Sequence, residues 1–142
     1  MQVKELMRGS VITVDPGDAV SSAARLLYKY NIGALPVCSD DGRIKGIVTD
    51  RDIVLRCVAA EADPEKTPIR EIMTRNVVTV SPSDDVREAT RLMATDQIRR
   101  LPVVDEGKVV GMLSLGDISK SHNYSMEASK ALTEISSNVN RK

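Results

Sequence analysis

MRGSVITVDPGDAVSSAARLLYKYNIGALPV, residues 7–37, is followed later in the chain by a related stretch, MTRNVVTVSPSDDVREATRLMATDQIRRLPV, residues 73–103. Nearly half of the aligned positions are identical, and further on two glycines and two aspartates also align (Gly46 with Gly111, Asp52 with Asp117). Each copy of such a repeat is one supersecondary unit that must bury its apolar face against a neighbour. The chain is therefore a tandem duplication, and we expect a pseudo-two-fold pair.

Size and composition indicate a soluble globular protein. The chain has 142 residues, 42% of them apolar and 28% charged, and a half of about 60 residues would be marginal alone. With 20 basic and 20 acidic side chains the net charge is zero, which does not favour a nucleic-acid surface. Lys4 and Glu5 place charge where a signal peptide would be apolar, and no apolar run approaches the roughly 20 residues of a membrane span. We expect a cytoplasmic protein without a membrane or nucleic-acid partner.

Each half is predicted to be β-α-β-β-α, an α+β fold in which helices cover one face of a small mixed sheet. In both halves we expect a short strand, an amphipathic helix of about three turns, a hairpin with an acidic-Gly turn, and a second helix. A short helical turn should precede each first strand. In the first half these elements are Val3–Met7, Val11–Val14, a helix with Val20, Ala23, Ala24 and Leu27 on one face, Leu35–Cys38 with Ile44–Val48, and Asp50 to about Ala60. In the second they are Ile69–Met73, Val77–Val80, a helix with Val86, Ala89 and Met93 on one face, Leu101–Val104 with Val109–Leu113, and Gly116 to about His122.

The domain organisation follows from the repeats. We assign residues 1–60 to repeat 1, residues 61–68 to a polar linker, residues 69–122 to repeat 2 and residues 123–142 to a tail without an upstream counterpart. The tail is expected to be partly helical or disordered. In it Met126, Leu132 and Ile135 would form one side of a short helix, and residues 136–140 should fray.

Cysteine and histidine do not indicate a metal site. Cys38 and Cys57 both lie in the first repeat without CxxC spacing, and His122 is the sole histidine. We expect two reduced thiols. A disulfide or a shared metal remains the alternative.

The positions that indicate chemistry lie where the last strand of each half becomes its last helix. Thr49 and Asp52 in one copy correspond to Ser114 and Asp117 in the other. A hydroxyl followed three residues later by an acid has the form of a helix-capping box. A capping box more often ends in Glu or Gln than in the shorter Asp. A second interpretation is therefore open, in which the Asp carboxylate accepts hydrogen bonds from both hydroxyls of a ribose. Sequence alone does not separate the two.

At these residues the chain resembles a known family. The pattern Leu-Pro-Val, acidic-Gly turn, then Gly, two apolar residues, Thr or Ser, two residues and Asp occurs twice in order, from about Val3 to Ser121. It is similar to a pair of cystathionine-β-synthase (CBS) domains, also called a Bateman module. The Gly33–Pro36 and Thr49–Ile53 segments are especially similar to small prokaryotic proteins made of a CBS pair alone.

The resemblance implies regulatory binding of AMP, ADP, ATP or S-adenosylmethionine in clefts between the repeats, with no other cofactor required. It assigns Thr49 with Asp52, and Ser114 with Asp117, to the hydroxyl and ribose-binding acid of two sites. It also assigns phosphate contacts to Arg99 and Arg100, which we expect to face the Asp52 site. The first copy has Gly33 and Ala34 there, so we expect two unequal sites, or one that is occupied. A plain solvated arginine pair is the alternative, because adjacent strand residues point to opposite faces.

The family pattern also suggests which residues would surround adenine. These are Ile12, Ala34, Leu35 and Pro36 in the first copy, with Val78, Leu101 and Pro102 in the second. A role in the hydrophobic core is the competing interpretation for each of them. Arg51 stands beside Asp52 and could contact phosphate, although its counterpart is Gly116.

Three function classes remain to be compared. The sequence contains no phosphate loop or nucleophile elbow, and no base stands beside either cysteine, so we do not expect an enzyme. The main alternative to a nucleotide sensor is a ligand-free structural or protein-interaction module of the same fold. In either case the resemblance implies a homodimer and an unidentified effector protein.

Overall fold

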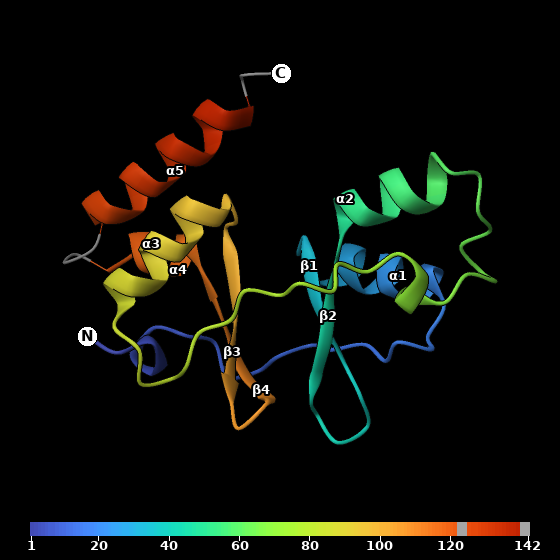
Figure 1. Ribbon diagram of the computed structural model, residues 1–142, viewed down its shortest axis with the longest axis horizontal. Helices are drawn as coiled ribbons and strands as arrows, with labels where there is room; N and C mark the ends of the chain where they lie inside the picture. The colour runs from blue at the N-terminus through green and yellow to red at the C-terminus, as the bar shows by residue number, and fades with distance from the viewer. Residues whose placement is uncertain (122–124, 140–142) are drawn as a thin grey trace. The chain divides into compact units, whose positions relative to one another are not determined.

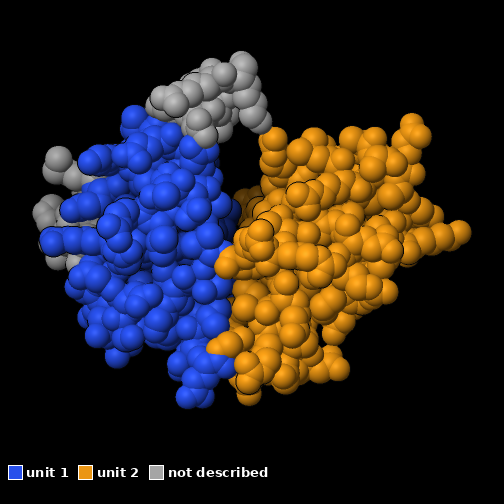
Figure 2. Space-filling view, viewed as in Figure 1, with its two compact units in different colours: residues 1–11, 78–106, 110–142 blue, residues 12–77, 107–109 orange. Residues whose placement is uncertain are grey.

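The computed structural model describes residues 1–121 and 125–139, and it forms two compact units (Figures 1 and 2). Unit 1 comprises Met1–Val11, Val78–Glu106 and Val110–Lys142. Unit 2 comprises Ile12–Val77 and Gly107–Val109. Each unit has its own hydrophobic core.

Unit 2 contains α1 (Val20–Tyr30), the antiparallel strands β1 (Ala34–Cys38) and β2 (Ile44–Thr49), and α2 (Asp50–Ile53), which continues as a π-helical stretch, Val54–Val58. The predicted apolar face of α1 is buried as expected, with Val20, Ala23 and Leu27 in the core. Gly42 adopts a φ of +85° in the hairpin turn, a conformation that glycine reaches without strain. The prediction of an α+β fold with a helix and a hairpin in each half is therefore confirmed.

Unit 1 repeats this order with α3 (Val86–Asp96), β3 (Arg100–Asp105), β4 (Lys108–Ser114) and α4 (Leu115–Ser119). Its core includes Val86, Ala89 and Met93 from α3, as predicted. α4 ends at Ser119, before the expected end at about His122, which itself lies outside the described residues. Within residues 1–121 and 125–139, no helix is long and apolar enough to cross a membrane.

The predicted first strands do not form. In each unit they are reduced to one parallel bridge, Val14 with Val37 and Val80 with Val103. Val14 donates to the carbonyl of Pro36 (3.1 Å) and accepts from Cys38 (2.8 Å). The next rung would need an N–H from Pro36, which proline lacks, so the ladder stops there. Pro102 has the same effect in unit 1, where Val80 donates to its carbonyl at 3.1 Å.

The leading segment of each repeat packs in the unit built mainly from the other repeat. The helical turn Val3–Glu5 belongs to unit 1, where Val3 is fully buried and donates to the carbonyl of Asp84 (2.8 Å). The turn Ile69–Glu71 belongs to unit 2, where Ile69 is fully buried and donates to the carbonyl of Asp18 (2.8 Å). Both turns were predicted as short helices, but the compact units differ from the sequence repeats because these leading segments are exchanged.

The tail forms α5 (Ser125–Val139), which lies against α3 and α4 of unit 1 (Figure 1). The predicted buried face was wrong in part. Ala128, Ala131 and Ile135 are buried, whereas Leu132 is 41% exposed, because small side chains allow α5 to approach α3 and α4 closely. The side chain of Met126 lies outside the described residues. The helix runs to Val139, and the expected fraying of residues 136–140 stays a prediction.

Gly46 in β2 and Gly111 in β4 allow the exchanged segments to approach the hairpins. A Cβ at Gly46 would lie 2.8 Å from the Thr74 carbonyl oxygen, and one at Gly111 would lie 3.0 Å from that of Arg8. Both contacts are too short for a side chain, so only glycine fits without displacing the segment that follows each leading turn.

We therefore expect Gly46→Ala to destabilise the protein by about 1–3 kcal/mol, because overpacking forces the backbone to shift. Urea unfolding followed by circular dichroism measures this. Gly9→Ala is the matched control, since nothing lies within 4 Å of a Cβ at Gly9. Equal unfolding midpoints for the two variants would contradict the packing argument.

Candidate functional site

In unit 2 the candidate carboxylate is fixed at the junction of β2 and α2. The Asp52 main-chain N–H donates to Thr49 Oγ1 (3.0 Å), and the Thr49 N–H donates back to Asp52 Oδ2 (3.0 Å). This is the capping box that the sequence allowed. Asp52 Oδ1 lies outside the box and accepts from the Thr74 hydroxyl (3.2 Å). Asp52 is only 7% exposed, so its orientation is well defined.

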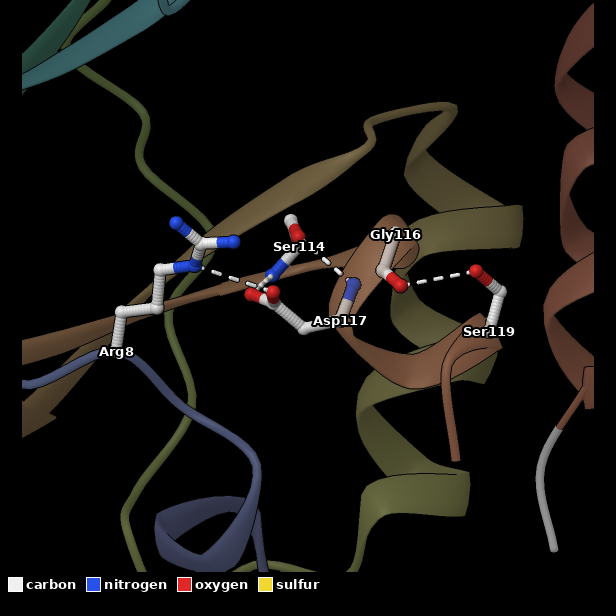
Figure 3. Close-up of polar contacts among 5 residues, drawn as sticks. All are labelled: Arg8, Ser114, Gly116, Asp117 and Ser119. Carbon is white, nitrogen blue, oxygen red and sulfur yellow. Dashed lines mark hydrogen bonds and ion pairs between the residues drawn. The ribbon is translucent and has the colours of Figure 1, made fainter. Parts of the chain in front are cut away.

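Unit 1 repeats this arrangement at the junction of β4 and α4 (Figure 3). The Asp117 N–H donates to Ser114 Oγ (3.0 Å), and the Ser114 N–H donates to Asp117 Oδ2 (3.2 Å). The remaining oxygen, Oδ1, accepts from Arg8 Nε (3.2 Å) in an ion pair. Figure 3 shows the Arg8 guanidinium pointing at this carboxylate from the leading segment of the unit.

The two carboxylates therefore differ in their third partner. Thr74 and Arg8 occupy equivalent positions, each directly after a methionine of the repeat. A hydroxyl can rotate to make room for another donor, whereas a ligand at Asp117 Oδ1 would share that oxygen with Arg8 or displace the ion pair. Our sequence reasoning did not identify either residue. The aligned pair Arg8 and Thr74 was the available signal, but only the exchange of the leading segments brings these residues to the acids.

Arg99 and Arg100 lie together with Ser114 in unit 1. They line a cavity of about 330 Å³, whose other lining residues are Leu115, Gly116, Ser119, Ala128, Ser129 and Leu132. The Arg99 carbonyl accepts from the N–H of Leu115 (2.8 Å), which fixes the end of the strand beside α4. The expected contact between these arginines and the Asp52 site would join the two units, and it stays a prediction. The sequence analysis named Leu132 only for one side of the tail helix and did not name Ser129, because the tail has no counterpart in the repeat.

A second polar cavity, of about 610 Å³, lies in unit 2 beside the Asp52 partner Thr74. Three arginines contribute to it: Arg56, Arg70 and Arg75. Arg56 donates to the carbonyls of Ile72 (3.2 Å) and Met73 (3.4 Å), and Arg75 to that of Arg70 (3.2 Å). Unit 2 thus has cationic groups of its own near the candidate ribose acid. Their counterparts in the other repeat are Lys4, Gly9 and Ser121, so unit 1 lacks the cluster.

The residues expected around adenine are divided between surface and core. Ile12, Ala34 and Val78 are half-buried and retain surface for a ligand. Leu35 and Leu101 are fully buried in the cores of their units, and Pro36 and Pro102 are also buried. Leu35 and Leu101 therefore contribute to packing. Arg51 is exposed, and its main-chain N–H donates to Asp50 Oδ1 (2.8 Å).

Both cysteines are free and buried in unit 2. Burial raises the pKa of the Cys38 thiol, opposite to the shift that activates a nucleophilic cysteine. Within the part of the chain that the structure describes, no group of three or more His, Cys, Asp or Glu could hold a metal ion.

Known proteins with this arrangement share one domain type. The sequence profile of the CBS domain matches residues 3–58 and 69–122. The CBS domain-containing protein YhcV of Bacillus subtilis is 42% identical over 134 residues, 94% of each chain.

Two solved structures are also similar. Hypoxic Response Protein I, solved with two coordinated zinc ions, has a TM-score of 0.79 and 32% identity, covering 84% of this chain and 98% of that one. The CBS domain pair of protein MJ0100, solved with 5′-methylthioadenosine and S-adenosyl-L-methionine, has a TM-score of 0.76 and 35% identity, covering 84% and 94%.

The two junctions should respond differently to salt. Asp52→Ala and Asp117→Ala each remove the hydrogen bond that the N3 carboxylate accepts in a capping box, and should each destabilise the chain by about 0.5–1.5 kcal/mol. Only Asp117 also loses an ion pair, whose Arg8 side chain is 69% exposed. Salt screens such pairs. Urea unfolding at low and high NaCl should therefore show a smaller Asp117→Ala penalty in high salt and an unchanged Asp52→Ala penalty. Identical salt responses would contradict the assigned partners.

Proposed function

Because the chain belongs to the CBS domain family, as a tandem pair, we propose that it is a regulatory module that binds an adenosine compound and signals by a change of conformation. The observation that carries this proposal is the same hydroxyl–carboxylate junction in both units, with Oδ1 of each aspartate outside the capping box. A fixed carboxylate oxygen is a suitable acceptor for a ribose hydroxyl. The complex of MJ0100 with two adenosine compounds supports this ligand class.

We assign the tighter site to Asp52. Its Oδ1 accepts from the neutral hydroxyl of Thr74 rather than from an arginine. Thr74 also lines the cavity of unit 2 to which three arginines contribute. Thr49, Asp52 and Arg51 are the proposed polar contacts there, with Ile12 and Ala34 beside the adenine. In unit 1 the corresponding contacts are Ser114, Asp117 and Val78. We also place the phosphate contacts of Arg99 and Arg100 here rather than at the Asp52 site, because both arginines line the unit 1 cavity with Ser114. AMP, ADP, ATP and S-adenosylmethionine are the candidate ligands.

Two other functions are less well supported. Catalysis would need an activated nucleophile or a base, but both cysteines are buried, and burial raises the pKa of the Cys38 thiol. A ligand-free structural module would use the two junctions as capping boxes and nothing more. The cavity of unit 1 supports binding over that alternative, because it is lined by two arginines and no carboxylate.

We also propose a cytoplasmic homodimer that communicates with an effector protein. In unit 2 an apolar surface remains open on α1 and the π-helical stretch after α2: Tyr28, Val54, Leu55 and Val58 are each more than half exposed. The equivalent helices of unit 1, α3 and α4, are covered by α5. A second copy of the chain would bury the open surface of unit 2.

Binding can be tested by thermal shift with AMP, ATP, S-adenosylmethionine and adenosine. A ligand at 100 times its dissociation constant should add about 2.7 kcal/mol of stability. Asp52→Ala should remove more of this stabilisation than Asp117→Ala, and the two variants serve as controls for each other. If no adenosine compound raises the melting temperature of the unaltered chain, the sensor function is wrong and the structural alternative stands.

The dimer can be tested by light scattering at micromolar concentration. We expect about twice the mass of one chain, and Leu55→Glu should reduce it to one chain because charge cannot be buried unpaired in an apolar interface. Thr133→Glu, on α5, is the control and should leave the mass unchanged. A monomeric mass for the unaltered chain, with and without nucleotide, would contradict the proposal.

A further inference from the structure

The tail helix forms one wall of the cavity in unit 1 that holds Arg99 and Arg100. The matched CBS profile ends at residue 122, so α5 lies beyond the part of the chain that the family pattern covers. Ser129 and Leu132 of α5 line the cavity opposite the strand and helix residues, and its volume of about 330 Å³ falls in the range of small-molecule sites.

The lining of this cavity is suited to an anion. It contains two arginines and the hydroxyls of Ser114 and Ser129, and no carboxylate. The hydroxyl of Ser119, which also lines it, donates to the Gly116 carbonyl (2.9 Å). Among the described residues, neither Arg99 nor Arg100 has a hydrogen-bond or ion-pair partner for its side chain. Arg100 is half-buried and Arg99 is exposed, so both guanidinium groups keep N–H donors that a ligand can reach. A group that presents several oxygen atoms would satisfy both arginines.

The neighbouring groove on α5 has a different composition. Arg87 and Arg91 of α3 lie there with Glu127, Lys130 and Glu134 of α5, so charges of both signs are present. That groove has three basic and two acidic side chains, whereas the charged residues that line the Arg99–Arg100 cavity are both basic.

The helix α5 buries little apolar surface against the rest of unit 1. Its buried residues are Ala128, Ala131 and Ile135. Two of the three bury a single methyl group, and each buried methyl or methylene contributes only about 0.8 kcal/mol. A ligand that bridges α5 and the rest of unit 1 would therefore change its docking measurably.

We propose that the cavity between α5 and the Arg99–Arg100 end of β3 binds a phosphate group, and that Ser129 and Leu132 are part of that site. A bound phosphate accepts from both arginines and from the Ser129 hydroxyl, and so holds α5 against α3 and α4. Binding of the phosphate therefore favours the docked position of α5. This inference rests on the proposed function for the source of the phosphate, which is a nucleotide, but the site itself requires only the anion.

Hydrogen exchange of the α5 amides in the full chain tests this directly. A ligand that binds only the docked helix, at 100 times its dissociation constant, should slow exchange by up to about 100-fold. ATP should slow exchange in α5, whereas adenosine should not, because it lacks the anion. Inorganic phosphate is the third probe and distinguishes a nucleotide from free phosphate as the source.

Two variants with matched controls complete the design. Ser129→Glu places a carboxylate opposite the arginines, so exchange in α5 should slow without any ligand, and ATP should add little further protection. Thr133→Glu adds the same charge to the same helix at a residue that does not line the cavity, and it should behave as the unaltered chain. Arg100→Ala should abolish the difference between ATP and adenosine.

The outcomes separate the two proposals. If calorimetry detects nucleotide binding but exchange in α5 is unchanged, the sensor function stands and this inference is wrong. If phosphate alone slows exchange while no nucleotide binds, the inference stands and the nucleotide function falls. Equal protection by adenosine and ATP, or equal behaviour of Ser129→Glu and Thr133→Glu, would overturn the inference.

Discussion

The exchange of leading segments between the two repeats is the constraint on which the other features depend. Val3 and Ile69 are each fully buried in the unit formed mainly by the other repeat. Neither repeat can therefore complete its core from its own sequence, which agrees with the marginal size of each half. The same exchange carries Arg8 and Thr74 past the glycines of the hairpins and brings them to the candidate carboxylates. Fold and site are linked through these two short segments.

The two repeats share the strand–helix junction that holds the hydroxyl and the aspartate, but they differ in the residues around it. Both units retain the hydroxyl, the acid and the reciprocal capping hydrogen bonds, because these also form the first turn of the last helix. The residue that donates to Oδ1 is not part of the capping box, and it is a threonine in one unit and an arginine in the other. Unit 1 additionally gained α5, which covers α3 and α4 and contributes to its cavity. Similar sequences therefore give two sites with different charge.

Much of the fold could be predicted, because helical and hairpin periodicities are local properties of the chain. The face of α1 with Val20 and Leu27, and the turn at Gly42, follow from spacing and residue type alone. The first strands could not be predicted correctly, since Pro36 interrupts a ladder that is formed by a distant segment. The residues of the junction were found from the repeat, whereas Arg8, Thr74 and Ser129 reach the sites through tertiary packing. The core positions Leu35 and Leu101 were named as adenine contacts because a strand pattern does not reveal which face a ligand could reach.

The central claim is that the residue facing Oδ1 decides which unit binds the adenosine compound more tightly. Calorimetric titration of AMP into Thr74→Arg, compared with Arg8→Thr, tests it most directly, because each variant gives one unit the residue that the other already has. We predict that Thr74→Arg weakens AMP binding by about tenfold or more, equivalent to about 1.4 kcal/mol, and that Arg8→Thr does not weaken it. Unchanged affinity in Thr74→Arg, or a larger loss in Arg8→Thr, would contradict this account.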